Sequence, residues 1–192
     1  DNECDVFRSW DARKSDPNRN ILTRRVLPEV LAREDMTRPY LPSSPFVDEK
    51  AYATGLPLSE DHIWGPRDWF KGQYYSNTVC RFASEIGYHG CPEPDSLGRF
   101  LSANALSRRR FPQGECANAE WLTHAACMEI SKWCPYAYRI GLMAEQVQTL
   151  FGEDPEDLTR FAAESQISQA EADKYFVETF RIGKGIRTGI IW

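Results

Sequence analysis

The chain has 192 residues, of which 42% are hydrophobic, 12% aromatic and 27% charged, and its formal net charge is −5. This is the composition of a globular protein, and it excludes a disordered or fibrous chain. The acidic balance argues against binding to a nucleic-acid backbone, which needs a basic face. No apolar run approaches the length that spans a bilayer. We therefore expect neither a nucleic-acid nor a membrane partner.

The first third of the sequence predicts a helix followed by loops. Asp16-Pro17 is typical of a helix start, and apolar residues recur at helical spacing over 21–31. Pro28 interrupts this run and should kink the helix or start a new one. The segment 38–42 is expected to be a short extended segment, or strand, stiffened by two prolines. The Pro-, Ser- and Gly-punctuated stretch 43–60 is expected to be a loop.

The middle of the chain predicts two short strands. His62-Ile63-Trp64 is the first and 79–85 is the second, and both end at glycine- and proline-rich segments. A helix is expected over 96–106.

The last third is the most helical part. We expect helices over 119–133 and 136–151, a short one from Asp154-Pro155 to about residue 165, and another over 168–182 that opens with a capping box. A strand over 188–192 follows. Short strands that alternate with helices predict parallel βα units, and about four strands would make half of a (β/α)8 barrel.

The ends of the chain suggest a fragment, and the cysteines do not indicate a cellular compartment. The chain begins without Met and ends in an apolar, strand-like segment, so we expect a fragment. None of the six cysteines forms a C-x-x-C motif. Small buried thiols are the simplest interpretation, and one or two disulfides, Cys116–Cys134 for example, stay open.

Two glutamates are candidates for catalysis. Glu85 lies at the end of a predicted strand, where barrel enzymes build their active sites, and Glu3 follows Asn2, an amide donor beside an acid. Two carboxylates that face a cleft are what glycoside hydrolysis requires. By composition alone, either of them is more often one of many solvated surface groups.

Tryptophans could form a surface on which a sugar stacks. Trp10, Trp64 and Trp192 are the candidates, although tryptophan more often packs in a core. His62 precedes Trp64 by two residues, so both point to the same face of a strand. No histidine has metal-ligand spacing with another histidine or a cysteine, and we expect no metal and no cofactor.

Several motifs, in this order, carry a resemblance to a known family. They are Thr37-Arg38-Pro39-Tyr40, Ser43-Ser44-Pro45, His62-x-Trp64-Gly65 and Arg81-Phe82-Ala83-Ser84-Glu85-x-Gly87. The chain resembles the catalytic barrel of glycoside hydrolase family 2, in its β-mannosidase-like branch. Asn2-Glu3 resembles the motif that ends the fourth strand, and the segment 189–192 resembles the start of the eighth. The resemblance implies an α/β fold in which residues 1–192 form the C-terminal half of a TIM (β/α)8 barrel, strands 5–8 with intervening helices.

The resemblance also implies roles for individual residues. Glu3 would be the general acid/base, Glu85 the nucleophile, and Asn2 a donor to the sugar 2-hydroxyl. The subsite for the cleaved sugar would be lined by His62, Trp64 and Trp192, with a contribution from Trp10. A second carboxylate in a Trp-lined site favours the protonated acid, and the nucleophile must stay ionised, so we expect hydrogen-bond donors near Glu85.

The expected activity is that of a retaining exo-β-glycosidase that hydrolyses terminal β-mannosides and needs no cofactor. The segment 86–90 and Glu60 depart from the pattern of the branch, so a β-glucosaminidase or β-galactosidase of the same family stays open. A non-catalytic carbohydrate-binding or scaffold relative is the other alternative. The expected partners are a β-linked oligosaccharide or glycoconjugate and the remainder of the barrel with its accessory β-domains. Without these domains the isolated fragment should be inactive.

Overall fold

The computed structural model describes residues 3, 20–46, 49–55, 57–65, 67–107, 119–124 and 138–191. The chain divides into two compact units. The first unit comprises residues 1–64, 76–86 and 177–192, and the second comprises residues 65–75 and 87–176. Among the described helices, none is both long and apolar enough to cross a membrane.

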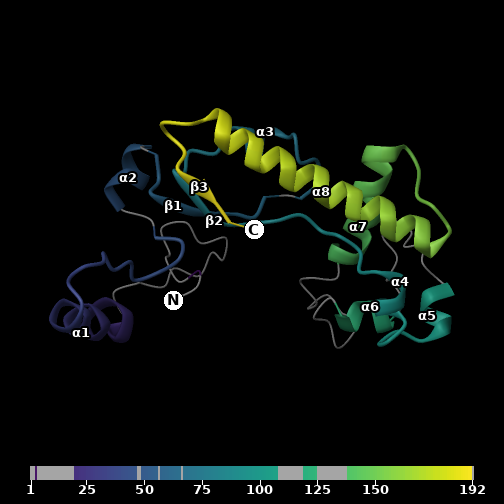
Figure 1. Cartoon of the computed structure of the whole chain (residues 1–192), viewed down its shortest axis with the longest axis horizontal. Coiled ribbons are helices and arrows are strands. Elements are labelled where there is room, and N and C mark those ends of the chain that lie inside the picture. Colours follow the sequence, from purple (N-terminus) through teal and green to yellow (C-terminus); the bar gives the residue numbers. More distant parts are fainter. Residues whose placement is uncertain are drawn as a thin grey trace. The chain divides into compact units, whose positions relative to one another are not determined.

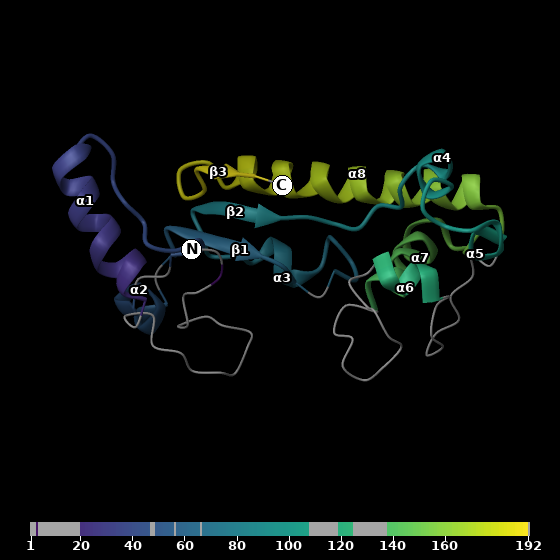
Figure 2. The same cartoon turned by 90° about the horizontal axis from the view of Figure 1, so that it is seen from below.

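The first unit contains a three-stranded parallel sheet. Its strands are β1 (Glu60–Ile63), β2 (Phe82–Ile86) and β3 (Gly189–Ile190), with β2 in the middle (Figures 1 and 2). Parallel neighbours need crossover connections, which here contain helices. The sheet confirms the expected α/β class with parallel strands and is compatible with part of a barrel. Within the described residues it has three strands, rather than the four that the sequence suggested.

A bulge sets the register between β1 and β2. Asp61 pairs with Ala83 and His62 pairs with Glu85, so Ser84 has no opposite residue on β1. An extra residue in one strand re-aims the side chains that follow it. The bulge therefore places His62 directly beside Glu85.

The N-terminal helices of the first unit follow the sequence in part. A π-helical turn, η3 (Leu22–Val26), leads into α1 (Leu27–Glu34), and Pro28 lies in the first turn of α1. The backbone stays helical across this point, so Pro28 marks a change from π-helix to α-helix rather than the start of a separate helix. A further helix, α2 (Glu49–Thr54), lies in the stretch that was expected to be a loop. Glu, Lys and Ala favour a helix there, and the prolines and glycines mark only its flanks.

The second unit is built mainly from helices. They are α4 (Pro94–Leu97), α5 (Ala103–Ser107), α6 (Ala119–His124), α7 (Tyr138–Phe151) and the first part of α8 (Leu158–Ile182), while α3 (Gln73–Ser76) begins in this unit and ends in the first. An apolar cluster holds them together and includes Leu97, Trp121, Val147 and Phe161. Two short helices, α4 and α5, replace the single helix predicted over 96–106, and of the helix predicted over 119–133 only residues 119–124, α6, lie within the described residues.

The 25-residue helix α8 corrects the prediction of two helices in this region. Ser168 does not cap a new helix: its hydroxyl donates to the carbonyl of Glu164, one turn earlier in the same helix, at 2.9 Å. The Ser165 hydroxyl accepts the backbone N–H of Cys91 at 3.0 Å. Because both hydroxyls find partners while the helix continues, the capping-box pattern does not end it.

Candidate functional site

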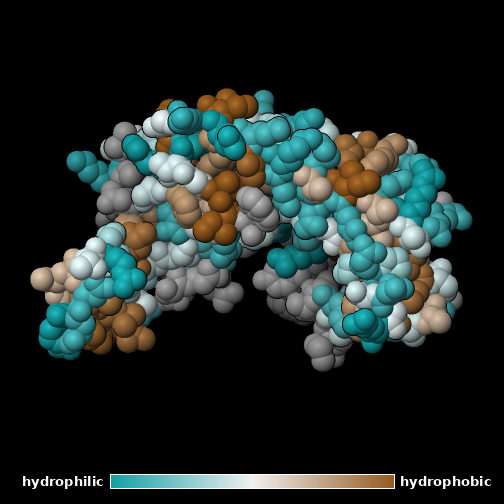
Figure 3. Space-filling model, viewed as in Figure 1, coloured by the Kyte–Doolittle hydropathy of each residue, from teal (hydrophilic) through white to brown (hydrophobic). Residues whose placement is uncertain are grey.

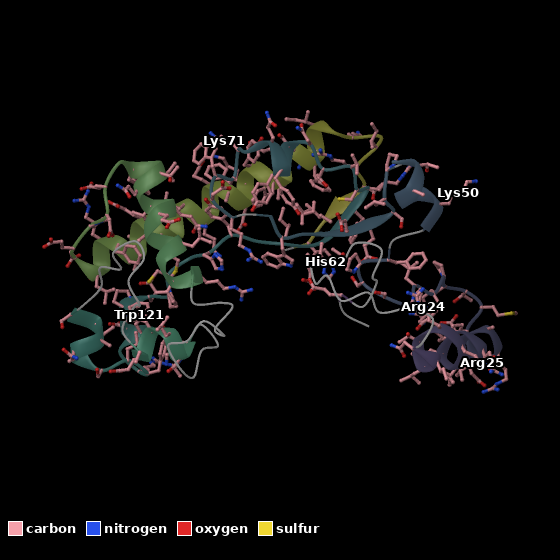
Figure 4. All side chains as sticks on the ribbon, turned by 180° about the vertical axis from the view of Figure 1, so that it is seen from behind. Arg24, Arg25, Lys50, His62, Lys71 and Trp121 are labelled. Carbon is pink, nitrogen blue, oxygen red and sulfur yellow. The ribbon has the colours of Figure 1, made fainter. Side chains whose placement is uncertain are left out.

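The candidate site lies at the carboxyl ends of β1 and β2. His62 is the third residue of β1, Trp64 follows that strand directly, and Glu85 is the fourth residue of β2. Since the strands are parallel, their carboxyl ends meet at one edge of the sheet. The side chain of His62, labelled in Figure 4, lies in this part of the first unit.

Glu3 and Glu85 meet at the imidazole of His62. The Nδ1 atom of His62 is 3.0 Å from Oε1 of Glu3 and 3.4 Å from Oε2 of Glu85. One oxygen of each carboxylate and one ring nitrogen all lie within 4.8 Å of one another. The imidazole side chain is only 4% exposed, whereas the carboxylates are 27% and 37% exposed. The two acids are therefore open to a ligand and share a buried base.

Trp64 supplies a hydrogen-bond donor beside Glu85, as was expected for a nucleophile that must stay ionised. Its indole Nε1–H donates to Oε2 of Glu85 at 2.9 Å. A hydrogen bond to a carboxylate favours its ionised form. The tryptophan that was expected to line the sugar site thus also orients the carboxylate.

The backbone holds Glu3 in place. Its N–H donates to the carbonyl of Ser44 at 2.6 Å, and its φ of 55° lies in the left-handed region, which is uncommon for a residue with a side chain. Such outliers persist where surrounding contacts determine them, and they concentrate at functional sites.

Sequence reasoning missed the polar residues behind His62. The Ser44 hydroxyl lies 3.0 Å from Nε2 of His62, donates to Oε1 of Glu60, and is 3.4 Å from the Ser84 hydroxyl. Glu60 is buried at 8% exposure. Ser44 and Ser84 lie in the sequence motifs quoted above, and Glu60 is a position that departs from the pattern of the β-mannosidase-like branch. Nothing in their spacing indicates that they contact one another.

The three ligand atoms at the centre of the site would also suit a cation by distance. However, the imidazole nitrogen faces both carboxylates, and Glu85 already accepts from Trp64. The described groups therefore contact one another directly. What they can do chemically is hold and transfer a proton beside a second carboxylate.

The structure brings four of the seven predicted site residues together. Glu3, His62, Trp64 and Glu85 form one connected group. The other three, Asn2, Trp10 and Trp192, lie outside the described residues.

Two cysteines can be placed. Cys80 and Cys91 are buried free thiols, as the simplest interpretation of the sequence had it. Burial raises the pKa of the Cys91 thiol to about 12, so this thiol is inert near neutral pH. The example pair Cys116–Cys134 lies outside the described residues.

Comparison with known proteins adds one structural relationship. No family model matches the sequence, and no curated protein matches it. The fold is similar to that of a β-D-mannosidase from Dictyoglomus thermophilum, with a TM-score of 0.73 and 25% identity. The match covers 100% of this chain and 22% of that chain. The chain is thus similar, over its whole length, to a segment of a glycoside hydrolase.

Proposed function

We propose that this chain is part of the catalytic barrel of a retaining exo-β-glycosidase that acts on terminal β-mannosides. One observation carries the proposal: the carboxylates of Glu3 and Glu85, from distant parts of the sequence, meet at one imidazole with oxygens within 4.8 Å of His62 and of each other. The similarity to a β-D-mannosidase supports the same class of reaction.

The short separation favours a retaining mechanism. Retaining glycosidases hold their two carboxyl groups about 5–5.5 Å apart, whereas inverting enzymes leave about 6.5–9.5 Å to admit a water molecule. One oxygen of each carboxylate lies within 4.8 Å of the other, which agrees with the first arrangement.

The reaction then proceeds in two displacements. Glu3, protonated, donates its proton to the glycosidic oxygen while a carboxylate oxygen of Glu85 attacks the anomeric carbon and the bond to the aglycone breaks. Glu3, now ionised, takes a proton from water, and the water oxygen attacks the same carbon and releases Glu85. The proton on Glu3 is thereby restored, and no cofactor is consumed.

The remaining predicted residues would recognise the sugar. Asn2 would bond the 2-hydroxyl, and Trp10, Trp192 and Trp64 would flank the ring. The indole Nε1–H of Trp64 donates to Glu85, so this edge of the ring lies at the candidate nucleophile. We propose a mannoside as the substrate because the similar solved structure is a β-D-mannosidase.

Apolar surface on the first unit fits a chain that is completed by further barrel segments. Exposed apolar side chains lie at the N-cap of η3 and within it, where Ile21, Leu22 and Val26 are 63%, 58% and 42% exposed. Others lie around β3, where Ile186 and Ile191 are 60% and 55% exposed. Apolar side chains are visible on the face shown in Figure 3. Exposed apolar side chains that gather on one face can mark an interface. We propose that the rest of the barrel covers it.

The test is covalent trapping of the complete protein with a 2-deoxy-2-fluoro-β-mannosyl fluoride, followed by mass spectrometry of peptides. The expected result is one added fluoromannosyl group on Glu85, and none in a Glu85→Gln variant. Assays with aryl β-mannoside, β-glucosaminide and β-galactoside rank the three sugars. Labelling of a different carboxylate would disprove the nucleophile, and no hydrolysis of any of the three glycosides would favour the non-catalytic alternative.

The 192-residue chain alone is expected to give no measurable turnover, because the sugar site and the barrel core are incomplete without the missing strands. The measurement is hydrolysis of an aryl β-mannoside by the purified chain. Robust turnover, retained after a second purification step, would contradict this expectation.

A further inference from the structure

A chain of hydrogen bonds runs behind the candidate site. It links the carboxylate of Glu60, the hydroxyl of Ser44 and Nε2 of His62. Glu60 and His62 lie two residues apart on β1, and Ser44 reaches them from a separate segment. The histidine side chain is 4% exposed, so among the described groups these contacts determine how its ring is protonated.

The direction of each hydrogen bond follows from the donor inventory. With Glu60 as the acceptor, the Ser44 hydroxyl donates its one proton to this carboxylate. The alternative acceptor, the Ser84 hydroxyl, is farther away at 3.4 Å and itself donates to the carbonyl of Asp61. With its proton committed to Glu60, Ser44 can only accept from the imidazole. Nε2 of His62 must therefore carry a hydrogen.

The other ring nitrogen of His62, Nδ1, faces the carboxylates of Glu3 and Glu85. If Nε2 carries the only ring proton, Nδ1 presents a lone pair to the oxygens of Glu3 at 3.0 Å and Glu85 at 3.4 Å. Two facing acceptors without a hydrogen between them repel. One proton must lie among Nδ1 and the two carboxylates. The titratable groups that face the ring in the described residues are Glu3, Glu85 and, through Ser44, Glu60.

We propose that Ser44 and Glu60 are positioning residues that hold His62 in its Nε2–H form, so that Nδ1 shares with Glu3 the one proton that general-acid catalysis uses. The inference rests on the proposed function of Glu3 as the acid/base. When the proton lies on Glu3, it hydrogen-bonds to Nδ1 in the free enzyme and turns to the glycosidic oxygen once the substrate is bound. When it lies on Nδ1, the imidazolium bridges two ionised carboxylates. The total number of protons is the same in both states.

The first test reads the protonation of the ring directly, without activity. It is solid-state ¹⁵N NMR of the complete protein labelled at histidine ring nitrogens, with the His62 signals assigned by their loss in a His62→Gln variant. The expected result is a protonated Nε2 in the wild type and a loss of this fixed form in Ser44→Ala. Ser59→Ala is the matched control, since Ser59 is exposed and bonds the Phe46 carbonyl. An unprotonated Nε2 in the wild type would overturn the inference.

The second test separates acid assistance from folding. Ser44→Ala and Glu60→Gln are expected to lower kcat/KM about tenfold for a mannoside with a sugar aglycone, which must be protonated to leave. For a dinitrophenyl mannoside, whose leaving group needs no proton, the expected change is less than about twofold. An equal loss on both substrates would mean a merely structural role and would overturn the proposal.

The two tests also distinguish this inference from the proposed function. A protonated Nε2 that depends on Ser44, in a protein that hydrolyses no glycoside, supports the positioning of His62 and disproves the proposed function. Hydrolysis with an unprotonated Nε2 supports the proposed function and disproves the positioning.

Discussion

Both units bury polar side chains, but they use them differently. In the second unit, Gln146 donates to the carbonyl of Arg67 at 2.6 Å and Ser168 donates to that of Glu164, while buried Glu164 accepts from the surface side chain of Arg160. In the first unit, Ser44, His62 and Glu3 bond one another through their side chains. Polar groups that satisfy the backbone stabilise a fold, whereas groups that bond one another around open carboxylates are suited to chemistry.

Two tryptophans show the same contrast. The indole N–H of Trp121 donates to the carbonyl of Ala105 at 3.2 Å, inside the apolar cluster of the second unit. That of Trp64 donates to the Glu85 carboxylate at 2.9 Å. The same donor therefore fills a structural need in one unit and orients a candidate nucleophile in the other.

The largest effect should come from the carboxylates of the first unit. Glu85→Gln is expected to lower kcat for an aryl β-mannoside by at least about 10³-fold, because the amide cannot form the covalent intermediate. The melting temperature should change little, since Glu85 is partly exposed. The measurement is steady-state kinetics of the complete protein beside a thermal melt, with Glu34→Gln on α1 as the control. Unchanged hydrolysis would remove Glu85 from the mechanism.

The second unit should respond in stability instead. Phe161→Ala removes a fully buried ring from the apolar cluster and is expected to lower the free energy of unfolding by about 3–5 kcal/mol. Phe151→Ala is the matched control, since this phenylalanine on α7 is 39% exposed. Denaturant unfolding of both variants measures the difference. Equal losses would mean that the cluster is not the core of this unit.

Substitution of Trp64 and Trp121 compares the two units more directly, with smaller expected effects on activity and stability. Trp64→Phe removes the donor to Glu85 and should lower kcat/KM about 10-fold, with little loss of stability. Trp121→Phe leaves the carbonyl of Ala105 without this donor and should cost about 1–3 kcal/mol of stability, with activity unchanged. Kinetics and denaturant unfolding of both variants decide between them. If both variants lose only stability, the contrast between the units fails.

The sequence predicts local features of this protein better than it predicts contacts. Strands at His62 and Glu85 follow from β-branched and aromatic residues between turn residues, and the motifs point to both glutamates. The bulge at Ser84, which sets His62 opposite Glu85, leaves no such pattern. The Ser44–Glu60 contact joins residues 16 positions apart, so only the fold brings them together. The continuous α8 was missed because Ser165 and Ser168 find their partners in tertiary structure and within the helix.

The smallest expected effect concerns a carboxylate of the second unit that takes no part in the proposed chemistry. Asp173, on α8, is partly buried, and its Oδ1 has no hydrogen-bond partner among the described residues. Burial raises the pKa of Asp173 to about 6, from an ordinary value of 3.8. Between these two values the unfolded chain has released this proton and the folded chain has not. This group therefore lowers stability as the pH rises from about 4 to about 6, and by a constant amount above that.

Asp173→Asn should remove this pH-dependent loss. Because the side chain is only partly buried, solvent screens the effect, and we expect a gain of roughly 1 kcal/mol above pH 6, or about 2–4 °C in Tm. Below about pH 4 the variant and the wild type should melt alike. Glu171→Gln, an exposed member of an ion pair with Lys174 on the same helix, is the control and should stay within about 1 °C of the wild type. An equal gain at pH 4 and pH 7 would mean that asparagine at position 173 packs better than aspartate, and that the buried charge is not the cause.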